Sequence, residues 1–322
     1  MDIYYEKNLK EWLEFYHDYL TDGSDTRVGK LPDVIVAGFM KCGSTAIWHL
    51  LNCCDDVNVS VPVENMLNTS HESYNIYNYP KEIKYFSEDR VNKHFDLSWY
   101  KRHFICDGKP CVDIDQAIGQ DLPGAGDAWS RVLDPVILEQ FTGDIIFLVR
   151  NPIDRAWSQW LHYKSILPRS ENWGVWSPDE SFVYNLINSD QFIRDYVYNI
   201  NMAVEHFGAS RVHVLVSERL KPKWPQVVDT LGQSGSNGTK LDKIQPEYVD
   251  VEEYDRLFDI IGVPRKNSDQ IKAGLPYGTA HIRPASNKLS SEIRAQCRDI
   301  FKPQVEQLFT ITGVIDEWVD FI

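Results

Sequence analysis

The chain has 322 residues, of which 43% are hydrophobic and 25% are charged, as in an ordinary globular protein. Its formal net charge of −14 disfavours nucleic acid as a partner, because phosphate contacts need clustered Lys and Arg. No apolar run approaches the roughly 18 residues that cross a bilayer, and the acidic, aromatic N-terminus is unlike a signal peptide. These features favour a soluble cytoplasmic protein without a membrane partner, with an excised domain as the alternative.

Residues 1–30 predict an amphipathic helix followed by a polar turn, because apolar residues recur at helical spacing from Leu9 to Leu20. We expect this N-terminal extension to pack on the rest of the molecule or on a subunit partner, which leaves a homodimer open. Residues 31–322 are interpreted as one α/β core, and the whole chain, residues 1–322, as a single domain.

The first strong motif follows an apolar run at residues 34–37. Residues 38–45 read Gly-Phe-Met-Lys-Cys-Gly-Ser-Thr and lead into an apolar helical stretch, a strand–loop–helix pattern. Such a loop presents backbone N–H groups and a helix N-terminus, and so should bind a phosphate. The P-loop of nucleoside triphosphatases has Lys directly before Ser or Thr. Here Gly43 precedes Ser44 and Lys41 stands three positions earlier, which indicates a different phosphate ligand.

The second motif follows the continuous apolar run at residues 145–149, which predicts a buried parallel strand. A metal-dependent phosphoryl-transfer enzyme would usually place an Asp there to hold Mg²⁺. This chain instead continues with Arg150, whose guanidinium binds anions directly, and with Asn-Pro. Ser158 follows two helical turns later and is a candidate to share the anion. The sequence therefore predicts two anion sites and no obvious metal site.

Predicted strands alternate with predicted helices along the chain. This order indicates an α/β fold, with a mainly parallel sheet flanked by helices and a P-loop-like strand–loop–helix. The ligand should lie at the carboxyl ends of the strands, where both motifs emerge.

The two motifs resemble those of sulfotransferases that use 3′-phosphoadenosine 5′-phosphosulfate (PAPS). Residues 38–45 are similar to the 5′-phosphosulfate loop, and residues 150–158 to the 3′-phosphate site, R-[ND]-P-x-x-R-x-x-S. Residues 80–86 and 289–313 resemble two segments of the heparan-sulfate-type branch. In the first of these, Lys84 stands where that branch has a histidine.

The resemblance implies PAPS as donor, adenosine 3′,5′-bisphosphate as product and no metal. Glu82 would be the general base, Lys41 would neutralise the leaving group, and Lys84 would tune the carboxylate or touch the sulfuryl oxygens. A solvated surface position is the alternative for Glu82. The expected cofactor contacts are Lys41, Cys42, Gly43, Ser44, Thr45, Ala46, Arg150, Ser158, Gly278 and Arg283.

The acceptor is predicted to be a small molecule or a saccharide, with a hydroxyl or an amine as the attacking group. The net charge favours a neutral or cationic acceptor over a sulfated glycan. The candidate acceptor contacts are Asp113, Asp115, Trp173, Trp176 and His281. Polar and aromatic loop positions facing water are an equally open interpretation of these residues.

Two other functions stay open at this stage. A nucleotide-dependent small-molecule kinase of P-loop type would need Mg²⁺, and Arg150 in place of a metal-binding Asp counts against it. A non-catalytic binding protein is disfavoured by the intact set of Lys41, Glu82 and Arg150. Among the six cysteines, Cys106 and Cys111 would pair only in an oxidising compartment.

Overall fold

The computed structural model describes residues 29–60, 83, 85, 86, 96–104, 106–116, 118, 134–166, 181–188, 195–223, 246–275 and 289–322. Within these residues, five strands form one sheet in the order β2-β3-β1-β4-β5, and every pair is parallel. The strands are β1 (Val34–Val36), β2 (Asn58–Val59), β3 (Cys111–Ile114), β4 (Asp144–Val149) and β5 (Val212–Val216). The predicted α/β fold with a mainly parallel sheet is thereby confirmed.

Strand β1 is central in the sheet and pairs with β3 on one side and with β4 on the other. The chain runs from β1 to β2 on the first side, whereas β4 and β5 extend the sheet on the second side. The strand order therefore reverses at β1. In open α/β sheets, ligands bind at the carboxyl ends of the strands beside such a reversal.

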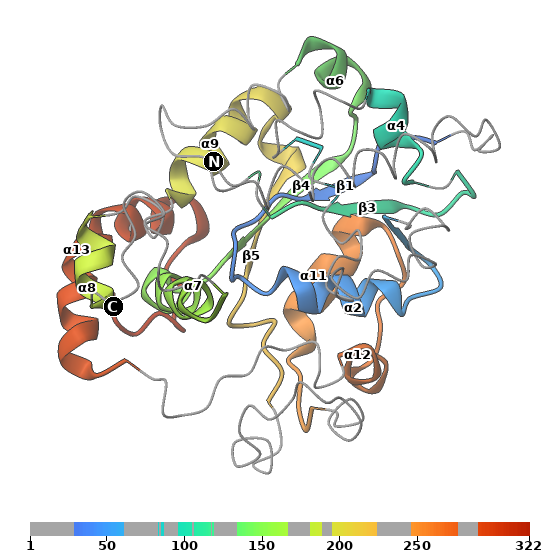
Figure 1. Cartoon of the computed structure of the whole chain (residues 1–322). Helices are drawn as coiled ribbons and strands as arrows, with labels where there is room; N and C mark the ends of the chain where they lie inside the picture. The colour runs from blue at the N-terminus through green and yellow to red at the C-terminus, as the bar shows by residue number, and fades with distance from the viewer. Residues whose placement is uncertain are drawn as a thin grey trace.

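Helices cover both faces of the sheet (Figure 1). On one face α9 (Tyr196–Phe207) contacts β4 and β5, and on the other α11 (Val251–Ile261) contacts β5 and α2 (Ser44–Asn52) contacts β2. A third group packs beside the sheet and comprises α7 (Pro152–Ile166), α8 (Phe182–Asn188) and α13 (Ser291–Thr312). The remaining helices are α4 (Leu97–Lys101), α6 (Pro135–Gln140), η5 (Ala209–Arg211) and α12 (Ser268–Gly274).

Local sequence explains where several helices begin and end. The side chain of Asp195 caps α9 by accepting from the Tyr198 N–H, and Asp250 caps α11 by accepting from the Glu252 N–H. Such caps satisfy backbone donors that have no partner inside the helix. Helix α11 ends at Gly262, whose φ of 79° lies in the left-handed region that glycine adopts without strain.

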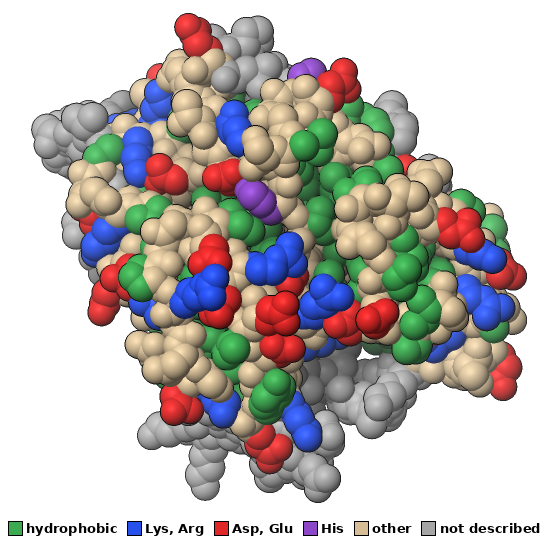
Figure 2. Space-filling model, turned by 180° about the vertical axis from the view of Figure 1, so that it is seen from behind, with side chains coloured by type: hydrophobic (Ala, Val, Ile, Leu, Met, Phe, Trp, Pro, Cys, Tyr) green, Lys and Arg blue, Asp and Glu red, His purple; other side chains and the backbone are tan. Residues whose placement is uncertain are grey.

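The surface carries mixed charge on the face opposite to that of Figure 1. Figure 2 shows Lys and Arg side chains interspersed with Asp and Glu on this face. Among the described residues, no helix is both long and apolar enough to cross a membrane. All six cysteines are free thiols, including Cys106 and Cys111.

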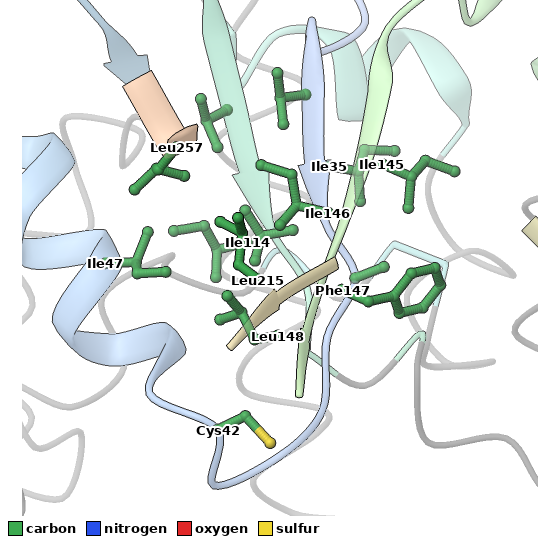
Figure 3. Close-up of a cluster of buried hydrophobic side chains, with 14 of the residues drawn as sticks. Ile35, Cys42, Ile47, Ile114, Ile145, Ile146, Phe147, Leu148, Leu215 and Leu257 are labelled. Atoms are coloured by element: carbon green, nitrogen blue, oxygen red, sulfur yellow. The ribbon is translucent and has the colours of Figure 1, made fainter. Parts of the chain in front are cut away.

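The core lies on both faces of the sheet, as expected for a parallel sheet between helical layers. In β4, every side chain after Asp144 is at most 1% exposed. Figure 3 shows Ile146 and Leu148 directed toward Ile47 of α2 and Leu257 of α11, and Phe147 on the opposite side. Because all the strands are parallel, the loops that follow them emerge together at the carboxyl edge.

The remaining predictions about chain organisation fall largely outside the described residues. Residues 1–28 of the proposed N-terminal extension are not described, so its helix and its packing stay predictions. The interpretation of residues 1–322 as a single domain likewise remains a prediction.

Candidate functional site

The loop between β1 and α2 turns sharply through two residues with left-handed backbone conformation. Lys41 has φ 71° and Gly43 has φ 94°, and Lys41 is the one non-glycine residue with positive φ in the described part of the chain. The Cys42 N–H donates to the Phe39 carbonyl at 3.1 Å, which closes the turn. A non-glycine residue in this conformation is uncommon and clusters at ligand-binding sites.

The loop runs close along β4 before it turns. A Cβ atom added to Gly38 would lie 2.3 Å from the backbone nitrogen of Leu148, a distance that no real side chain adopts. Only glycine therefore allows this approach. This close approach places the start of the loop against β4, the strand that directly precedes Arg150.

The first turn of α2 begins directly at the loop. Gly43 is the N-cap residue and offers no side chain, and its carbonyl accepts from the Ala46 N–H at 2.9 Å. Ser44 is 2% exposed, and its Oγ donates to Oε1 of Gln116 at 2.8 Å. Thr45 and Ala46 are half-buried in the same turn. The positive end of the helix dipole thus points at the predicted phosphate position.

Cys42 is directed into the loop and is 1% exposed (Figure 3). Burial raises the pKa of its thiol to about 12, although the positive charges of Arg155 and Arg150 act in the opposite direction. The thiol is therefore neutral at physiological pH and packs as a small apolar group. Any contact from Cys42 to a ligand would come from its backbone.

Arg150 joins the two sequence motifs directly. Its Nη1 donates to the carbonyl oxygen of Lys41 at 2.9 Å, across 109 residues of sequence. The Nε of Arg150 is buried and has no hydrogen-bond partner. None of the ion pairs formed within the described residues includes Arg150. A half-buried guanidinium with an unsatisfied, buried Nε and no carboxylate contact among the described residues is a favourable place for an anion to bind.

Asn151 fixes the turn that carries Arg150. Its N–H donates to Oε1 of Glu218 at 3.1 Å, and its Oδ1 accepts from the Ile153 N–H at 3.1 Å, which caps the start of α7. The Tyr196 hydroxyl donates to the Arg150 carbonyl at 2.7 Å. The peptide group that joins Arg150 to Asn151 is therefore held by two side chains, those of Glu218 after β5 and of Tyr196 in α9.

The C-terminal residues complete this support. Trp318 is fully buried and donates its Nε1–H to Oε2 of Glu218 at 3.1 Å. Asp320 accepts from Nδ2 of Asn151 at 2.9 Å and from Nε of Arg294 at 2.9 Å. Hydrogen bonds from Arg294 hold the pKa of the Asp320 carboxyl below its ordinary value. Arg294 also bonds Asp154 of α7, at 2.6 Å.

Comparison with known proteins identifies the family. A family model described as the sulfotransferase domain matches residues 31–233, which is more than half of the chain. The chain belongs to the sulfotransferase domain family. Residues 38–45 and 150–158 both lie within the matched region of this sulfotransferase.

Solved structures agree at the level of the fold. A crystal structure of a sulfotransferase from Alicyclobacillus acidocaldarius matches with a TM-score of 0.52 and 16% identity, covering 89% of this chain and 98% of that one. A mouse sulfotransferase, SULT7A1 complexed with PAP, matches with a TM-score of 0.42 and 12% identity over 94% of this chain and 91% of that one. The second likeness is too low to carry an argument. No curated protein matches the sequence.

Two predicted acceptor contacts lie at the end of β3 in this sulfotransferase and are buried. Asp113 is 1% exposed, and its Oδ2 accepts from the Tyr100 hydroxyl at 2.6 Å. Burial raises the pKa of the Tyr100 hydroxyl well above its ordinary value, and the negative charge of Asp113 raises it further. Asp115 follows β3 and is fully buried. A structural role in the core is thus visible for Asp113, and the acceptor role of both carboxylates stays a prediction.

The other predicted site residues divide into two groups. Ser158 lies half-buried on α7, on the helix that starts at the Arg150 turn. The rest fall outside the described residues and keep their predicted roles only as predictions: Glu82, Lys84, Trp173, Trp176, Gly278, His281 and Arg283. Among the residues that are described, no group of three His, Cys, Asp or Glu side chains is arranged to hold a metal ion.

The structure adds residues that the sequence motifs did not single out. Gln116 binds Ser44, and the Oγ of Ser217 lies 3.5 Å from the position of a Cβ added to Gly43. Glu218 and Lys221 follow β5 on the same edge. The sequence could have indicated these residues. Each follows within a few positions of a predicted strand, and ligands bind at the carboxyl ends of such strands.

Proposed function

We propose that this sulfotransferase moves a sulfuryl group from PAPS to a hydroxyl or an amine of a small-molecule or saccharide acceptor. The observation that carries the proposal is the contact between Arg150 and the Lys41 carbonyl. It supports a single anion-binding edge built from the loop and from an arginine that forms no ion pair with a described carboxylate and keeps a buried, unsatisfied Nε. A cofactor with phosphate groups at both ends of a nucleoside fits such an edge.

The residues present fit the two anionic ends of PAPS. Lys41, the backbone N–H groups of residues 42–46 and the N-terminus of α2 would hold the 5′-phosphosulfate. Arg150 and Ser158 would hold the 3′-phosphate, and the buried Nε of Arg150 is a donor available for that contact. Gly278 and Arg283 would close over the cofactor. The cofactor supplies an activated sulfuryl group, and the protein positions and neutralises charge.

Three residues take part in the proposed chemistry. Glu82 takes the proton of the acceptor hydroxyl or amine as the new bond to sulfur forms. Lys41 neutralises the phosphate oxygen that is released when its bond to sulfur breaks, and Lys84 adjusts the pKa of the Glu82 carboxyl. No metal takes part in this proposal.

The described residues that follow Glu82 in the sequence pack near β3. Ile83 is 6% exposed, and the ring of Phe86 packs edge-on against Tyr100 with centroids 5.0 Å apart. Tyr100 in turn bonds Asp113 of β3. The residues that directly follow Glu82 therefore pack on the core beside β3, and the position of Glu82 itself stays a prediction.

Charge and motif likeness favour different acceptors. The net charge of −14 and the mixed charges in Figure 2 favour a neutral or cationic small molecule, which Asp115, Trp173, Trp176 and His281 could contact. The likeness of residues 80–86 to the heparan-sulfate-type branch favours a saccharide. An unsulfated sugar with a free hydroxyl or amine satisfies both.

Calorimetric titration is the direct test of the cofactor. Adenosine 3′,5′-bisphosphate should bind with micromolar affinity and without dependence on chelator, whereas Mg·ATP should bind far more weakly. Replacing Arg150 with methionine should weaken the bisphosphate about 10- to 100-fold, because a charge-assisted contact to phosphate is lost. The matched control is Arg219→Met, since that arginine is already paired with Glu317 at 2.8 Å. Binding of Mg·ATP alone would overturn the proposal in favour of a kinase.

Turnover measurements test the catalytic roles. Lys41→Ala and Glu82→Gln should each lower turnover about 10²- to 10³-fold. Lys41→Gly should be equally inactive yet more stable than Lys41→Ala by roughly 1 kcal/mol, because glycine relieves the positive φ of 71°. That pair separates lost chemistry from lost folding. Full activity in Glu82→Gln would show that another group is the base.

A further inference from the structure

Gln116 joins the end of β3 to the first turn of α2. It follows the last residue of β3, Ile114, by two positions, and its Oε1 accepts from the Ser44 Oγ at 2.8 Å, across 72 residues of sequence. Ser44 is 2% exposed and Gln116 is half-buried. Strand β3 pairs with β1, the strand that leads into the loop, so this contact lies at the carboxyl edge of the sheet.

The start of α2 is the part of this edge that faces the proposed 5′-phosphosulfate. Its N-cap residue, Gly43, offers no side chain to cap the helix. The first backbone N–H groups of a helix have no partner inside it, and an anion can accept from them. The Ser44 hydroxyl is a side-chain donor in the same turn, so its direction bears on how an anion is held.

A serine hydroxyl has only one proton to donate. In this structure the proton of Ser44 is donated to the Gln116 oxygen, so it is directed away from an anion. The oxygen of Ser44 can also accept, and the Gln116 amide has N–H donors at its other end. A turn of about 180° about the terminal torsion of glutamine, which is broad and roughly two-fold, exchanges the two ends. The Nε2 of Gln116 forms no hydrogen bond with a described residue that would oppose this turn.

We propose that Gln116 is a positioning residue that directs the Ser44 hydroxyl to the 5′-phosphosulfate. Without the cofactor, the Gln116 oxygen accepts the Ser44 proton. With the cofactor bound, the turned amide donates from Nε2 to the Ser44 Oγ, and Ser44 donates to a phosphosulfate oxygen. The contact between Gln116 and Ser44 is kept in both states. The inference rests on the proposed function, because it assumes the same cofactor at the same edge.

The bound anion itself favours the turned amide. A hydrogen bond to a charged acceptor is stronger than one to a neutral amide oxygen. Donation from the Gln116 amide also polarises the Ser44 hydroxyl and makes it a better donor. Because Gln116 is half-buried, water can reach the amide and replace the hydrogen bond that its oxygen gives up. Gln116 should therefore matter only for ligands that carry a 5′-phosphate.

Titration with two nucleotides tests this role. In Gln116→Met, the affinity for adenosine 3′,5′-bisphosphate should fall about 5- to 10-fold, as expected for one lost hydrogen bond. The affinity for adenosine 3′-monophosphate, which lacks the 5′-phosphate, should change less than about twofold. Gln140→Met is the matched control, since Gln140 is an exposed glutamine that ends α6 before β4 and accepts from Lys101. Equal losses for both nucleotides, or unchanged affinity for the bisphosphate, would overturn the proposal.

A double-mutant cycle tests whether Gln116 acts through Ser44. In the Ser44→Ala background, Gln116→Met should change the affinity for the bisphosphate by less than about twofold, because the hydroxyl that Gln116 orients is missing. Equal losses in the two backgrounds would show that Gln116 does not act through Ser44, and the proposal would be wrong.

The variant Gln116→Glu removes the donor while keeping the contact. Its ionised carboxylate still accepts from Ser44 but has no N–H to donate, so β3 and α2 stay joined. Without nucleotide, it should unfold near the urea concentration of the wild type, yet its affinity for the bisphosphate should fall by more than about tenfold. In the Ser44→Ala background only charge repulsion remains, so the same substitution should cost less. Wild-type affinity in Gln116→Glu would contradict the proposal, because no amide donor would then be needed.

Stability separates positioning from a purely structural role. If Gln116→Met lowers the urea midpoint but binds both nucleotides like the wild type, Gln116 only joins β3 to α2 and the proposal fails. If the wild type binds neither nucleotide, the proposed function itself is wrong. The two failures are therefore distinguishable, since only the second one changes binding by the wild type.

Discussion

The loop at residues 38–45 and the turn at Arg150 present charge to the same space but are built differently. The loop depends on backbone geometry within eight neighbouring positions, including the close approach at Gly38 and the positive φ values of Lys41 and Gly43. The turn depends on side chains far away in the sequence, above all Glu218 and the C-terminal residues that contact it. The turn of the loop is therefore formed by neighbouring residues, whereas the turn at Arg150 is held by residues distant in the sequence.

Because the two sites are built differently, substitutions at different distances in the sequence should disrupt them. The loop should be most sensitive to changes at its own positions, where the backbone passes close to β4 and adopts positive φ values. The turn should respond to substitutions more than 60 residues away, because Glu218 and Asp320 bond Asn151 across 67 and 169 residues. Three substitutions, ordered by expected effect, test the contrast.

The largest effect is expected for Gly38→Ala in the loop. Its new Cβ would lie 2.3 Å from the Leu148 backbone nitrogen, so β1 and β4 would have to separate. Urea unfolding should show a loss of about 3 kcal/mol in the free energy of unfolding. At the control position Gly108, with φ 90° and no atom within 4 Å of an added Cβ, alanine should cost only roughly 1 kcal/mol of strain. Equal losses would refute the close-approach argument.

A smaller effect is expected for Glu218→Gln, which weakens the turn from a distance. The amide keeps one acceptor oxygen, so either the Asn151 N–H or the Trp318 Nε1–H loses its partner. The free energy of unfolding should fall by about 2 kcal/mol. Glu317→Gln, which removes a half-exposed ion pair with Arg219, should cost less than about 1 kcal/mol. If both variants are equally stable, the turn does not depend on this carboxylate.

The smallest effect is expected for Asp320→Asn and depends on pH. Because hydrogen bonds from Arg294 lower the pKa of Asp320, its carboxylate stabilises the fold above the unfolded pKa of about 3.9. Wild type should exceed the variant by roughly 1 kcal/mol at pH 7. The difference should vanish as the pH falls through the lowered pKa.

The matched control for this titration is Asp299→Asn. That carboxylate is 80% exposed and lies 3.7 Å from Arg298, so it should give no measurable difference at any pH. A constant gap between wild type and Asp320→Asn down to pH 2 would show that the ion pair with Arg294 is not the source of the stabilisation.

The sequence predicted the loop more completely than the turn at Arg150. Strand, glycine turn and helix around Lys41 follow from neighbouring residues, so their pattern alone indicates an anion loop. Arg150 was also predicted, because it directly follows a continuous apolar strand. Its contact to the Lys41 carbonyl was not, since it depends on β1 and β4 being adjacent.

The support around Arg150 could not be predicted for the same physical reason. Glu218, Trp318 and Asp320 have no local pattern that sets them apart from other polar or aromatic residues. Their roles arise only when β5 and the chain beyond α13 pack against α7. The hydrogen bond from Tyr100 to the buried Asp113 was likewise not predicted, and the acceptor role of Asp113 stays a prediction.

The central position of β1 has a consequence for the kinetics of folding. Val34 pairs with Val112 and with Asp144, so neither neighbour of this strand is close to it in the sequence. Pairings of such high contact order slow folding, because long loops must close before the contacts form. The anion-binding edge is therefore completed late, and a nucleotide added during refolding would trap only molecules whose sheet has already closed.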